Sequence, residues 1–427
     1  MTGRSSVKIA VIGSGGREHA LLWKLSKQNE VKELIAIPGN GGTLSIASSL
    51  TPNGNSVEAL ADSIRSCKPD LVIVGPEQPL AEGIADTLMK SGIPCFGPSA
   101  LAARIESSKV FSKELMRKYS IPTAEFEIFD DFDKLASFIR QNPCAYGRVA
   151  KADGLAAGKG AFVCSNDQEA IAVAKQLLVD DSLGAAGHRI VLEEKLFGTE
   201  ASAHFWCDGE HFAPLPVARD YKRALDDDLG PNTGGMGTLC PAGHVSADML
   251  SEIGETIIAP TLSAMQAEGC PYRGVLYAGL MLTDDGPRVI EFNCRFGDPE
   301  TQVMLPLMQD NLIETMLSCI DGTLKTSTGS PAASGAAVCV VLTAEGYPGS
   351  YRKDIPLRTI ENTGHTLLFH AGTTMKDGKL VSSGGRIFNA VGLGSDIETA
   401  RLNAYQSAHS LLVSGLRFRS DIAATAK

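Results

Sequence analysis

The 427-residue sequence contains ten cysteines but no Cys-x-x-Cys pair. Scattered cysteines without paired spacing indicate neither a disulfide framework nor a zinc site. Long hydrophobic runs are also missing, since no stretch approaches the roughly 18 consecutive apolar residues that a membrane-spanning helix requires. The opening segment MTGRSSVKIAVIGSGG lacks the basic start and the long apolar core of a signal peptide. We therefore expect a cytoplasmic protein without a membrane partner.

Positive charge is in deficit, because 49 acidic residues outnumber 39 Lys and Arg residues and the net charge is −10. Nucleic-acid binding needs a basic surface, so the composition argues against DNA or RNA as a partner. A local group of basic side chains beside glycines could still bind a small anion. With 44% hydrophobic and 21% charged residues, the chain has the composition of an ordinary globular protein with several domains.

Residues 1–103 alternate apolar strands with amphipathic helices, which is the pattern of a parallel, doubly wound sheet of the Rossmann-like kind. Strands are expected in VKIAVIG, ELIAIPG, DLVIVGP and IPCFG. Ligands bind such sheets at the carboxyl ends of the strands, and three of these ends carry GSGGRE, PGNGG and GPEQP. We expect a substrate site at this edge.

The remaining chain has mostly antiparallel strand patterns with helices, so an α/β region is followed by α+β regions in one multidomain protein. Residues 104–330 contain two predicted hairpins with Asp-Gly turns at 208–209 and 285–286. The small, polar segment 325–335 indicates a boundary. Residues 331–427 are expected to form a small β-rich domain that also has one long helix.

The first glycine motif lies between a predicted strand and a predicted helix. Gly13, Gly15 and Gly16 match the start of a dinucleotide-binding fingerprint, but Glu18 stands where its last glycine belongs and the second strand does not end in an acid. We therefore expect a smaller phosphorylated ligand at the helix N-terminus, with Arg17 close by. The alternative is a glycine turn that only packs.

The segment KADGLAAGKG, residues 151–160, is not a P-loop. Only three residues separate Gly154 from Gly158, Lys159 is followed by another glycine, and both flanks are strand-like. A loop between two strands is better suited to act as a flap that closes over a terminal phosphate and excludes water. Lys151, at its start, is expected to contact an α- or β-phosphate.

The strand RVIEFNCRF carries alternating polar side chains. Glu291, Asn293 and Arg295 are expected to point to one face, while Phe292 and Cys294 point to the buried side. A carboxylate and an amide oxygen suit Mg²⁺, which keeps water and phosphate oxygens as its other ligands. Arg295 is expected to pair with an anionic substrate. Exposed polar residues at a strand edge are the alternative.

Three further features each leave two interpretations open. The segment RDYKRALDDDLGPNTGGMG (219–237) combines a basic pair, three aspartates and a glycine-rich loop. The loop suits an amide-lined anion site and the acids an ammonium group, which together indicate a small amino acid, although charge runs are often solvated. RIVLEEKLFGTE (189–200) is either an adenine-binding strand end or a solvated acidic turn. Lys109 is either a phosphate ligand or a surface charge.

The order of these motifs along the whole chain resembles the glycinamide ribonucleotide synthetase family of ATP-grasp enzymes. GPNTGGMG and RFGDPE carry the resemblance most specifically, together with GSGGREHA, KADGLAAGKG and EGYPG. The resemblance implies an N-terminal Rossmann-like (pre-ATP-grasp) domain, a central ATP-grasp domain with a hinged subdomain at about 122–192, and a C-terminal domain.

The resemblance also implies the roles of individual residues. ATP would be bound by Lys109, Lys151, Gly154, Gly158, Lys159, Gly160, Glu193, Glu194, Lys195, Leu196 and Glu200. Substrates would be bound by Gly13, Gly15, Gly16, Arg17, Asn40, Gly75, Pro76, Glu77, Asp220, Lys222, Asp226, Asn232, Thr233, Gly234, Gly235, Met236, Arg295 and Asp298. Glu291 and Asn293 would bind Mg²⁺ or Mn²⁺, and the catalytic residues would be Lys151, Arg295 and Asp220.

The activity that this resemblance implies is the ATP-dependent ligation of glycine to 5-phosphoribosylamine through glycyl phosphate, by a monomer or a weak homodimer. The chain resembles the stand-alone form of the family. It departs from the family pattern at Tyr221, where histidine is usual, in the strand YGRVAK and in the tail FRSDIA. A different ATP-grasp ligase and a non-catalytic nucleotide-binding module are the alternatives.

Overall fold

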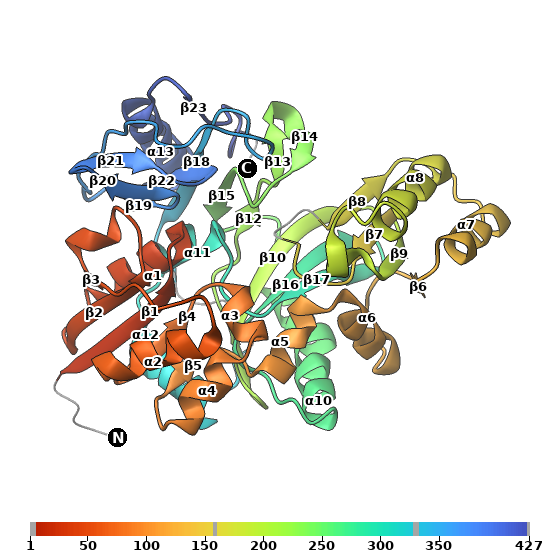
Figure 1. Ribbon diagram of the computed structural model, residues 1–427, viewed down its shortest axis with the longest axis horizontal. Helices are drawn as coiled ribbons and strands as arrows, with labels where there is room; N and C mark the ends of the chain where they lie inside the picture. Colours follow the sequence, from red (N-terminus) through yellow and green to blue (C-terminus); the bar gives the residue numbers. More distant parts are fainter. Residues whose placement is uncertain (1–5, 157–159, 328–332, 425–427) are drawn as a thin grey trace.

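The computed structural model describes residues 6–156, 160–327 and 333–424. Figure 1 shows the N-terminal part in red and orange, the C-terminal part in blue beside it, and a yellow subdomain that projects away from both. None of the described helices is long and apolar enough to cross a bilayer.

The N-terminal sheet is parallel, as the sequence predicts. Its strand order is β3-β2-β1-β4-β5, and the central strands are buried because they consist largely of Val, Ile, Leu and Ala. The strands are β1 (Val7–Gly13), β2 (Val31–Pro38), β3 (Ser48–Ser49), β4 (Leu71–Val74) and β5 (Cys95–Phe96). The helices are α1 (Gly16–Leu25), η1 (Thr43–Ser45), α2 (Val57–Cys67), α3 (Glu77–Ala81) and α4 (Ile84–Lys90).

The projecting subdomain is an antiparallel sheet of order β6-β9-β7-β8 with two covering helices. It has a hydrophobic core of its own, formed by Leu135, Ile139, Ala150, Leu177 and others. Its elements are β6 (Phe126–Phe129), α7 (Phe132–Gln141), β7 (Arg148–Ala152), β8 (Ala161–Cys164), α8 (Asp167–Leu178), η2 (Gly184–Gly187) and β9 (Ile190–Glu194). Helices α5 (Ala100–Ser107) and α6 (Lys109–Lys118) precede it in the chain.

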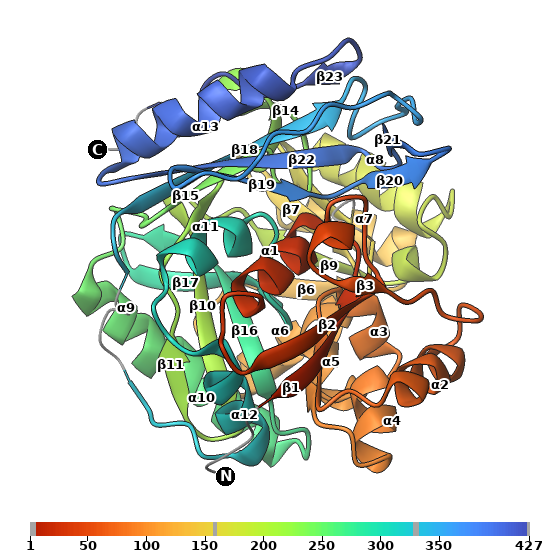
Figure 2. The ribbon, with the colours of Figure 1, turned by 90° about the vertical axis from the view of Figure 1, so that its left-hand side faces the viewer.

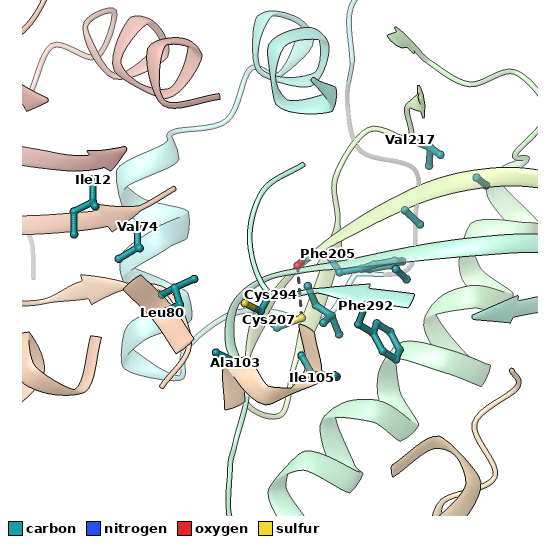
Figure 3. Close-up of a cluster of buried hydrophobic side chains, with 14 of the residues drawn as sticks. Ile12, Val74, Leu80, Ala103, Ile105, Phe205, Cys207, Val217, Phe292 and Cys294 are labelled. Carbon is teal, nitrogen blue, oxygen red and sulfur yellow. Dashed lines mark hydrogen bonds between the residues drawn. The ribbon is translucent and has the colours of Figure 1, made fainter. Parts of the chain in front are cut away.

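The central sheet is also antiparallel, with the order β11-β10-β16-β17. Both predicted hairpins are present in it, and Figure 3 shows Phe205 and Cys207 of β10 near Phe292 and Cys294 in a buried cluster with side chains of α5. The elements are β10 (Thr199–Asp208), β11 (Phe212–Pro214), α9 (Ala247–Ile253), η4 (Gly254–Ile258), α10 (Ala259–Ala267), β16 (Arg273–Thr283), β17 (Gly286–Asn293) and α12 (Leu312–Asp321).

The C-terminal sheet includes two strands from the middle of the chain, which the sequence did not predict. Its order is β12-β15-β18-β22-β19, with β23 paired to β18. The elements are β12 (Arg219–Asp220), β13 (Arg223–Leu225), η3 (Asp226–Asp228), β14 (Leu229–Asn232), β15 (Gly237–Cys240), β18 (Ala336–Ala344), β19 (Thr366–His370), β20 (Thr373–Lys376), β21 (Lys379–Ser382), β22 (Arg386–Gly394), α13 (Ile397–Leu411) and β23 (Leu416–Arg417). The NTGGMG loop therefore lies between β14 and a strand of the C-terminal sheet.

Helix α11 (Glu300–Leu307) connects the three parts of the molecule. It packs against α1 of the N-terminal part and against β15 and β18 of the C-terminal sheet, and Figure 2 shows it between these elements. The segment RFGDPE leads directly into this helix, so residues after β17 are held where the N-terminal, central and C-terminal sheets meet.

Candidate active site

A buried group of lysines marks the face of the projecting subdomain that looks toward the central sheet. Lys151, in β7, places its Nζ 2.9 Å from Glu193 Oε1 and donates to the carbonyl of Ile290 at 2.7 Å. Lys113 of α6 lies 3.2 Å from the same carboxylate, and burial lowers the pKa of Lys113 to about 8. The sequence did not single out Lys113, because a lysine inside a helix carries no local glycine signal.

Lys109 and Glu291 form a second ion pair next to the first. Lys109, the first residue of α6, lies 3.1 Å from Glu291 in β17. The charge of Lys109 holds the pKa of Glu291 well below its usual range, despite the opposing effect of burial. Burial acts to lower the pKa of Lys109, but Glu291 and Glu106 outweigh it and raise the value. Both groups are therefore charged at neutral pH.

The polar face predicted for β17 is present, with one correction. Phe292 and Cys294 are buried, and the Asn293 Oδ1 lies 3.4 Å from Arg295 Nη2, so these two polar side chains share a side. The strand, however, ends at Asn293, so Arg295 lies beyond it. Within the described part of the chain, no group of three or more His, Cys, Asp or Glu side chains could by itself hold a metal ion.

Arg295 is bound by two carboxylates that the sequence assigned to other roles or missed. Its Nε lies 3.2 Å from Glu77 at the start of α3, and its Nη2 lies 3.1 Å from Glu106 in α5. Glu106 also accepts from the backbone amide of Cys294 at 2.7 Å. Arg295 thus connects the N-terminal sheet edge with the end of β17.

The flap loop is anchored at its start. The Asp153 carboxylate accepts from Ser108 Oγ at 2.8 Å and from the Val110 amide at 3.1 Å, so the loop is attached to the N-terminus of α6. Gly154 has a φ of +154°. The backbone amide of Ala152 donates to the carbonyl of Gly160. Of the predicted phosphate residues, Gly158 and Lys159 lie outside the described residues.

The end of β9 is only partly consistent with a nucleotide-binding strand. The Glu193 carboxylate is paired with Lys113 and Lys151, so this side chain belongs to the lysine group. Glu194 accepts from the Glu125 amide at 3.0 Å. The Nζ of Lys195 lies 5.4 Å from the ring centroid of Phe197, and Leu196 is half-buried. The Glu200 carboxylate lies 3.8 Å from the amine of Lys222.

The glycines of GSGGRE surround a carboxylate of this chain. A Cβ added at Gly13, Gly15 or Gly75 would lie within 2.0–2.9 Å of Glu18 atoms. Glu18 Oε2 accepts from the Gly15 amide at 2.5 Å. Glu18 therefore already occupies one amide of the predicted phosphate site at the α1 N-terminus, and the site itself stays a prediction.

Other N-terminal candidates are also engaged within the protein. Arg17 is buried and donates to Glu18 at 2.6 Å and to the carbonyl of Phe296 at 3.1 Å. Asn40 donates to the carbonyls of Ser14 and His370, which attaches the PGNGG loop to the C-terminal sheet. At Gly16, an added Cβ would lie 2.2 Å from Asn389 Nδ2. Pro76 directly precedes α3, and Glu77, the first residue of that helix, pairs with Arg295.

The NTGGMG loop is not an open anion nest, contrary to the sequence interpretation. Its amides already have partners: Thr233 donates to Lys222 O, Gly234 to Tyr347 Oη, Gly235 to Thr233 Oγ1, and Met236 to Tyr221 O. Asn232 pairs with Arg223 in the β13–β14 hairpin. The loop instead forms a wall of the site, and Gly235 (φ +108°) has no room for a Cβ, which would lie 2.4 Å from Pro299.

The three candidate side chains that precede this loop, Asp220, Lys222 and Asp226, have different surroundings in the structure. Asp220 Oδ1 is buried without a hydrogen bond, and burial together with the charge of Glu300 raises the pKa of Asp220 well above its usual range. Interaction with Tyr277, and then with the acids Glu200, Glu291 and Asp220, raises the pKa of Lys222 against the effect of burial. Asp226 is bound instead by the amide and hydroxyl of Ser420, at 2.9 Å for the amide, so the expected substrate contact is not supported.

Asp298 is paired with an arginine that the sequence missed. Arg386, at the start of β22, lies 3.3 Å from Asp298 Oδ2 and donates to the carbonyls of Asp298 and Gly234. The neighbouring arginines, Arg386 and Arg17, hold the pKa of Asp298 low against the effect of burial. The sequence feature that could have identified Arg386 is its position directly after two glycines in SSGGRIF. The structure also brings Glu106, His204, Tyr277 and Glu300 to the site, none of which the sequence singled out.

Comparison with known families matches almost the whole chain. Models of the phosphoribosylglycinamide synthetase N domain, ATP-grasp (A) domain and C domain match residues 7–106, 107–301 and 337–425. These ranges do not test the boundaries predicted at 103/104 and 330/331, which stay predictions.

Similar proteins carry related names. A phosphoribosylamine–glycine ligase of Caldanaerobacter subterraneus subsp. tengcongensis is 43% identical, covering 98% of this chain and 100% of its own length. The trifunctional purine biosynthetic protein adenosine-3 of Gallus gallus is 46% identical over 97% of this chain, but the chain spans only 42% of that protein.

Solved structures have the same fold. The crystal structure of a phosphoribosylamine–glycine ligase from Thermotoga maritima has a TM-score of 0.85 and 36% identity, covering 97% of this chain and all of that one. A biotin carboxylase–ATP complex from Campylobacter jejuni has a TM-score of 0.74 at 15% identity, covering 97% and 93% of the two chains. The second likeness indicates a shared ATP-grasp fold alone.

Proposed function

Since the chain belongs to the phosphoribosylglycinamide synthetase family, we propose that it joins glycine to 5-phosphoribosylamine at the expense of ATP. The products are glycinamide ribonucleotide, ADP and phosphate. ATP phosphorylates the glycine carboxylate, and the amine of phosphoribosylamine then attacks the glycyl phosphate. This reaction belongs to purine biosynthesis and takes place in the cytoplasm.

The observation that best supports this proposal is the meeting of two lysines at one point of β17. Lys151 of the projecting subdomain donates to the carbonyl of Ile290, and Lys109 of α6 pairs with the next residue, Glu291. Two cations beside a flap loop suit the phosphates of a nucleotide, because such positioned charge stabilises phosphoryl transfer. Neither step needs a nucleophile from the protein, so positioning and charge neutralisation carry the catalysis.

Glu291 and Asn293 fit a hard divalent cation. Glu291 is ionised because Lys109 lowers its pKa, and Asn293 adds an amide oxygen from the same side of the chain. Mg²⁺ or Mn²⁺ takes two such protein oxygens together with water and phosphate oxygens. When bound, the ion would supply charge neutralisation at the nucleotide phosphates.

The other predicted residues receive roles that follow from their contacts. Glu193 holds Lys151 and Lys113 together at the proposed nucleotide site. Arg295 is shared by Glu77 and Glu106, so it reaches an anionic substrate only by exchanging one of these partners. Gly13 to Arg17 shape the edge where we place the ribose phosphate, with Asp298 and Arg386 on its C-terminal side.

The test is an ADP-release assay in which each substrate is omitted in turn. The proposal expects ADP only when ATP, glycine, phosphoribosylamine and Mg²⁺ are all present. A different ATP-grasp ligase would release ADP with another carboxylate or amine, and a non-catalytic nucleotide-binding module would bind ATP without glycine-dependent ADP release.

A further inference from the structure

Asp153 joins the projecting subdomain to α6, and no step of the proposed reaction uses it. This residue directly follows β7, two positions after Lys151, and its side chain is only 6% exposed. A buried carboxylate has lost its hydration, which is costly unless several donors replace the water. The donors around Asp153 therefore indicate what the residue does.

Three donors surround the carboxylate, and two of them belong to the N-terminus of α6. Asp153 Oδ1 accepts from the Ser108 hydroxyl at 2.8 Å and from the Val110 amide at 3.1 Å. Asp153 Oδ2 lies 2.5 Å from Nη2 of Arg189, which directly precedes β9. One oxygen of the carboxylate is thus bound by α6 and the other by the subdomain to which Asp153 itself belongs.

The first turn of α6 is capped by two residues together. Ser108 is the N-cap, and its hydroxyl oxygen accepts from the Phe111 amide at 3.1 Å. The Val110 amide has no partner inside the helix, as is general for the first amides of a helix, and Asp153 binds it. A carboxylate at this end also interacts favourably with the helix dipole. Without Asp153, the helix would keep its own cap but lose its attachment to the subdomain.

The same turn of α6 carries Lys109. This lysine lies in the chain between Ser108 and Val110, the two residues that bind Asp153 Oδ1. On the other side, a single residue separates Asp153 from Lys151 in β7. The bonds of Asp153 therefore connect the two lysines that we assign to the nucleotide phosphates.

These bonds are independent of the partners that the lysine amines now have. Lys109 is paired with Glu291, and Lys151 donates to the carbonyl of Ile290. Nucleotide binding must replace some of these partners, because Glu291 is also the proposed ligand of the divalent cation. Asp153 binds a hydroxyl and a backbone amide, and neither group takes part in that exchange. The spacing of the two lysines is therefore held while their amines change partners.

A second contact lies one turn farther along α6. The Lys113 amine lies 3.2 Å from the Glu193 carboxylate in β9 and donates to Thr123 Oγ1 at 2.7 Å. Together with Asp153, this contact attaches the subdomain to α6 at two points. Asp153 is the point next to Lys109, so it sets the position of that lysine relative to β7.

We propose that Asp153 is a positioning residue that holds Lys109 and Lys151 at the spacing needed to bind one triphosphate chain. The inference rests on the nucleotide site of the function proposed above, since it takes both lysines as phosphate ligands. The oxygens of Asp153 are occupied by donors of the protein, so the residue acts through the lysines and not by contact with the nucleotide.

A double-mutant cycle on the affinity for a non-hydrolysable ATP analogue with Mg²⁺ tests this role. Asp153→Ala is made alone and together with Lys109→Met, which keeps the length of the side chain but lacks the amine. We expect Asp153→Ala to raise the Kd of the analogue at least about fivefold in the parent but no more than about twofold beside Lys109→Met. The reason is that a spacing matters only while both lysines are present. Asp153→Asn, which keeps the shape and one acceptor oxygen, should restore part of the affinity.

Asp131→Ala is the matched control. Asp131 also caps a helix of the projecting subdomain, since it accepts from the Lys134 amide at 2.8 Å at the start of α7, but it is exposed. Its removal should leave the Kd of the analogue and the KM for glycine unchanged.

The same factor for Asp153→Ala in both backgrounds would overturn the inference, as would a Kd equal to that of the parent. The inference also fails if Lys109→Met binds the analogue like the parent, because Lys109 is then not a phosphate ligand. If Asp153→Ala does not fold, Asp153→Asn takes its place in the cycle under the same criteria. Coupling between the two residues in a protein that releases no ADP with glycine would support the positioning role and refute the proposed ligation.

Discussion

At the scale of single residues, most charged side chains of the candidate site are paired with one another. Lys109 pairs with Glu291, Lys151 with Glu193, and Arg295 with Glu77. The sequence predicted all six of these side chains as site residues, but it did not predict how they pair, because pairing depends on which elements meet. Ligand binding therefore exchanges one set of ion pairs for another.

Removing the Lys151 amine should slow phosphoryl transfer. Lys151→Ala is expected to lower kcat at least about a hundredfold, the scale of one lost electrostatic contact in a transition state. The fold should survive because Lys113 still pairs with Glu193. Steady-state kinetics and a melting curve check this, with the exposed Lys134→Ala as control. Near-normal turnover would remove Lys151 from the mechanism.

The metal requirement should respond to Glu291. Glu291→Gln keeps the shape of the side chain but removes a charge from the pair of hard oxygens, so the Mg²⁺ concentration for half-maximal activity should rise at least about tenfold. Asn293→Ala should act in the same direction with less effect. A Mg²⁺ titration of activity measures both. Titration curves that coincide with that of the parent would place the metal elsewhere.

At the scale of elements, the sequence predicted the regular strands and missed what connects them. The parallel strands of the N-terminal sheet and both central hairpins follow from apolar patterns and Asp-Gly turns. The local sequence does not predict that β12 and β15 join the C-terminal sheet, because the partner strand of β15, β18, lies about a hundred residues away. For the same reason the sequence misread NTGGMG as an open nest, although its amides are used within the fold.

The C-terminal tail holds the hairpin that leads into this loop. Arg419 is 1% exposed, pairs with Asp228 and Asp421, and donates to the carbonyl of Arg223. The ring of Tyr221 lies 5.4 Å from its guanidinium, on the opposite side from Asp220 and Lys222 along an extended segment. Tyr221 therefore packs against the C-terminal tail.

Loss of this contact should affect both stability and glycine binding. Arg419→Ala is expected to destabilise the protein by about 2 kcal/mol or more, because a buried, multiply bonded group is removed. The KM for glycine should rise while the KM for ATP changes little, since only the loop next to Asp220 loses support. Thermal melting and kinetics measure the two effects. Arg401→Ala, which removes a more exposed arginine near the tail, is the comparison, and equal effects in the two variants would contradict this role.

At the scale of the whole molecule, buried neutral histidines lie where the parts join. His19 of α1 accepts from the amide of His370 in the C-terminal sheet at 2.9 Å, and a Cβ at Gly42 would lie 2.5 Å from both rings. Burial, with a smaller contribution from His370, lowers the pKa of His19 to about 3, and burial lowers that of His370 to about 4. The junction is therefore stable only while both rings are uncharged.

Stability should consequently fall on acidification. Below pH ~6.5 the unfolded chain binds protons that the folded histidines exclude, so each buried ring costs about 1.4 kcal/mol per pH unit until its folded pKa is reached. Denaturant unfolding between pH 7 and pH 4.5 measures this slope. His19→Asn should reduce the slope, whereas His188→Gln, at an exposed position, should not. A slope that is the same in His19→Asn and in the parent would contradict the assignment.

The identity of the product decides whether this protein ligates glycine to phosphoribosylamine. The enzyme is incubated with ATP, Mg²⁺, ¹⁵N-labelled glycine and phosphoribosylamine, and the product is analysed by mass spectrometry. We expect glycinamide ribonucleotide that carries the label, formed in equal amount to ADP. ADP formed without labelled product, or without any requirement for glycine, would contradict it.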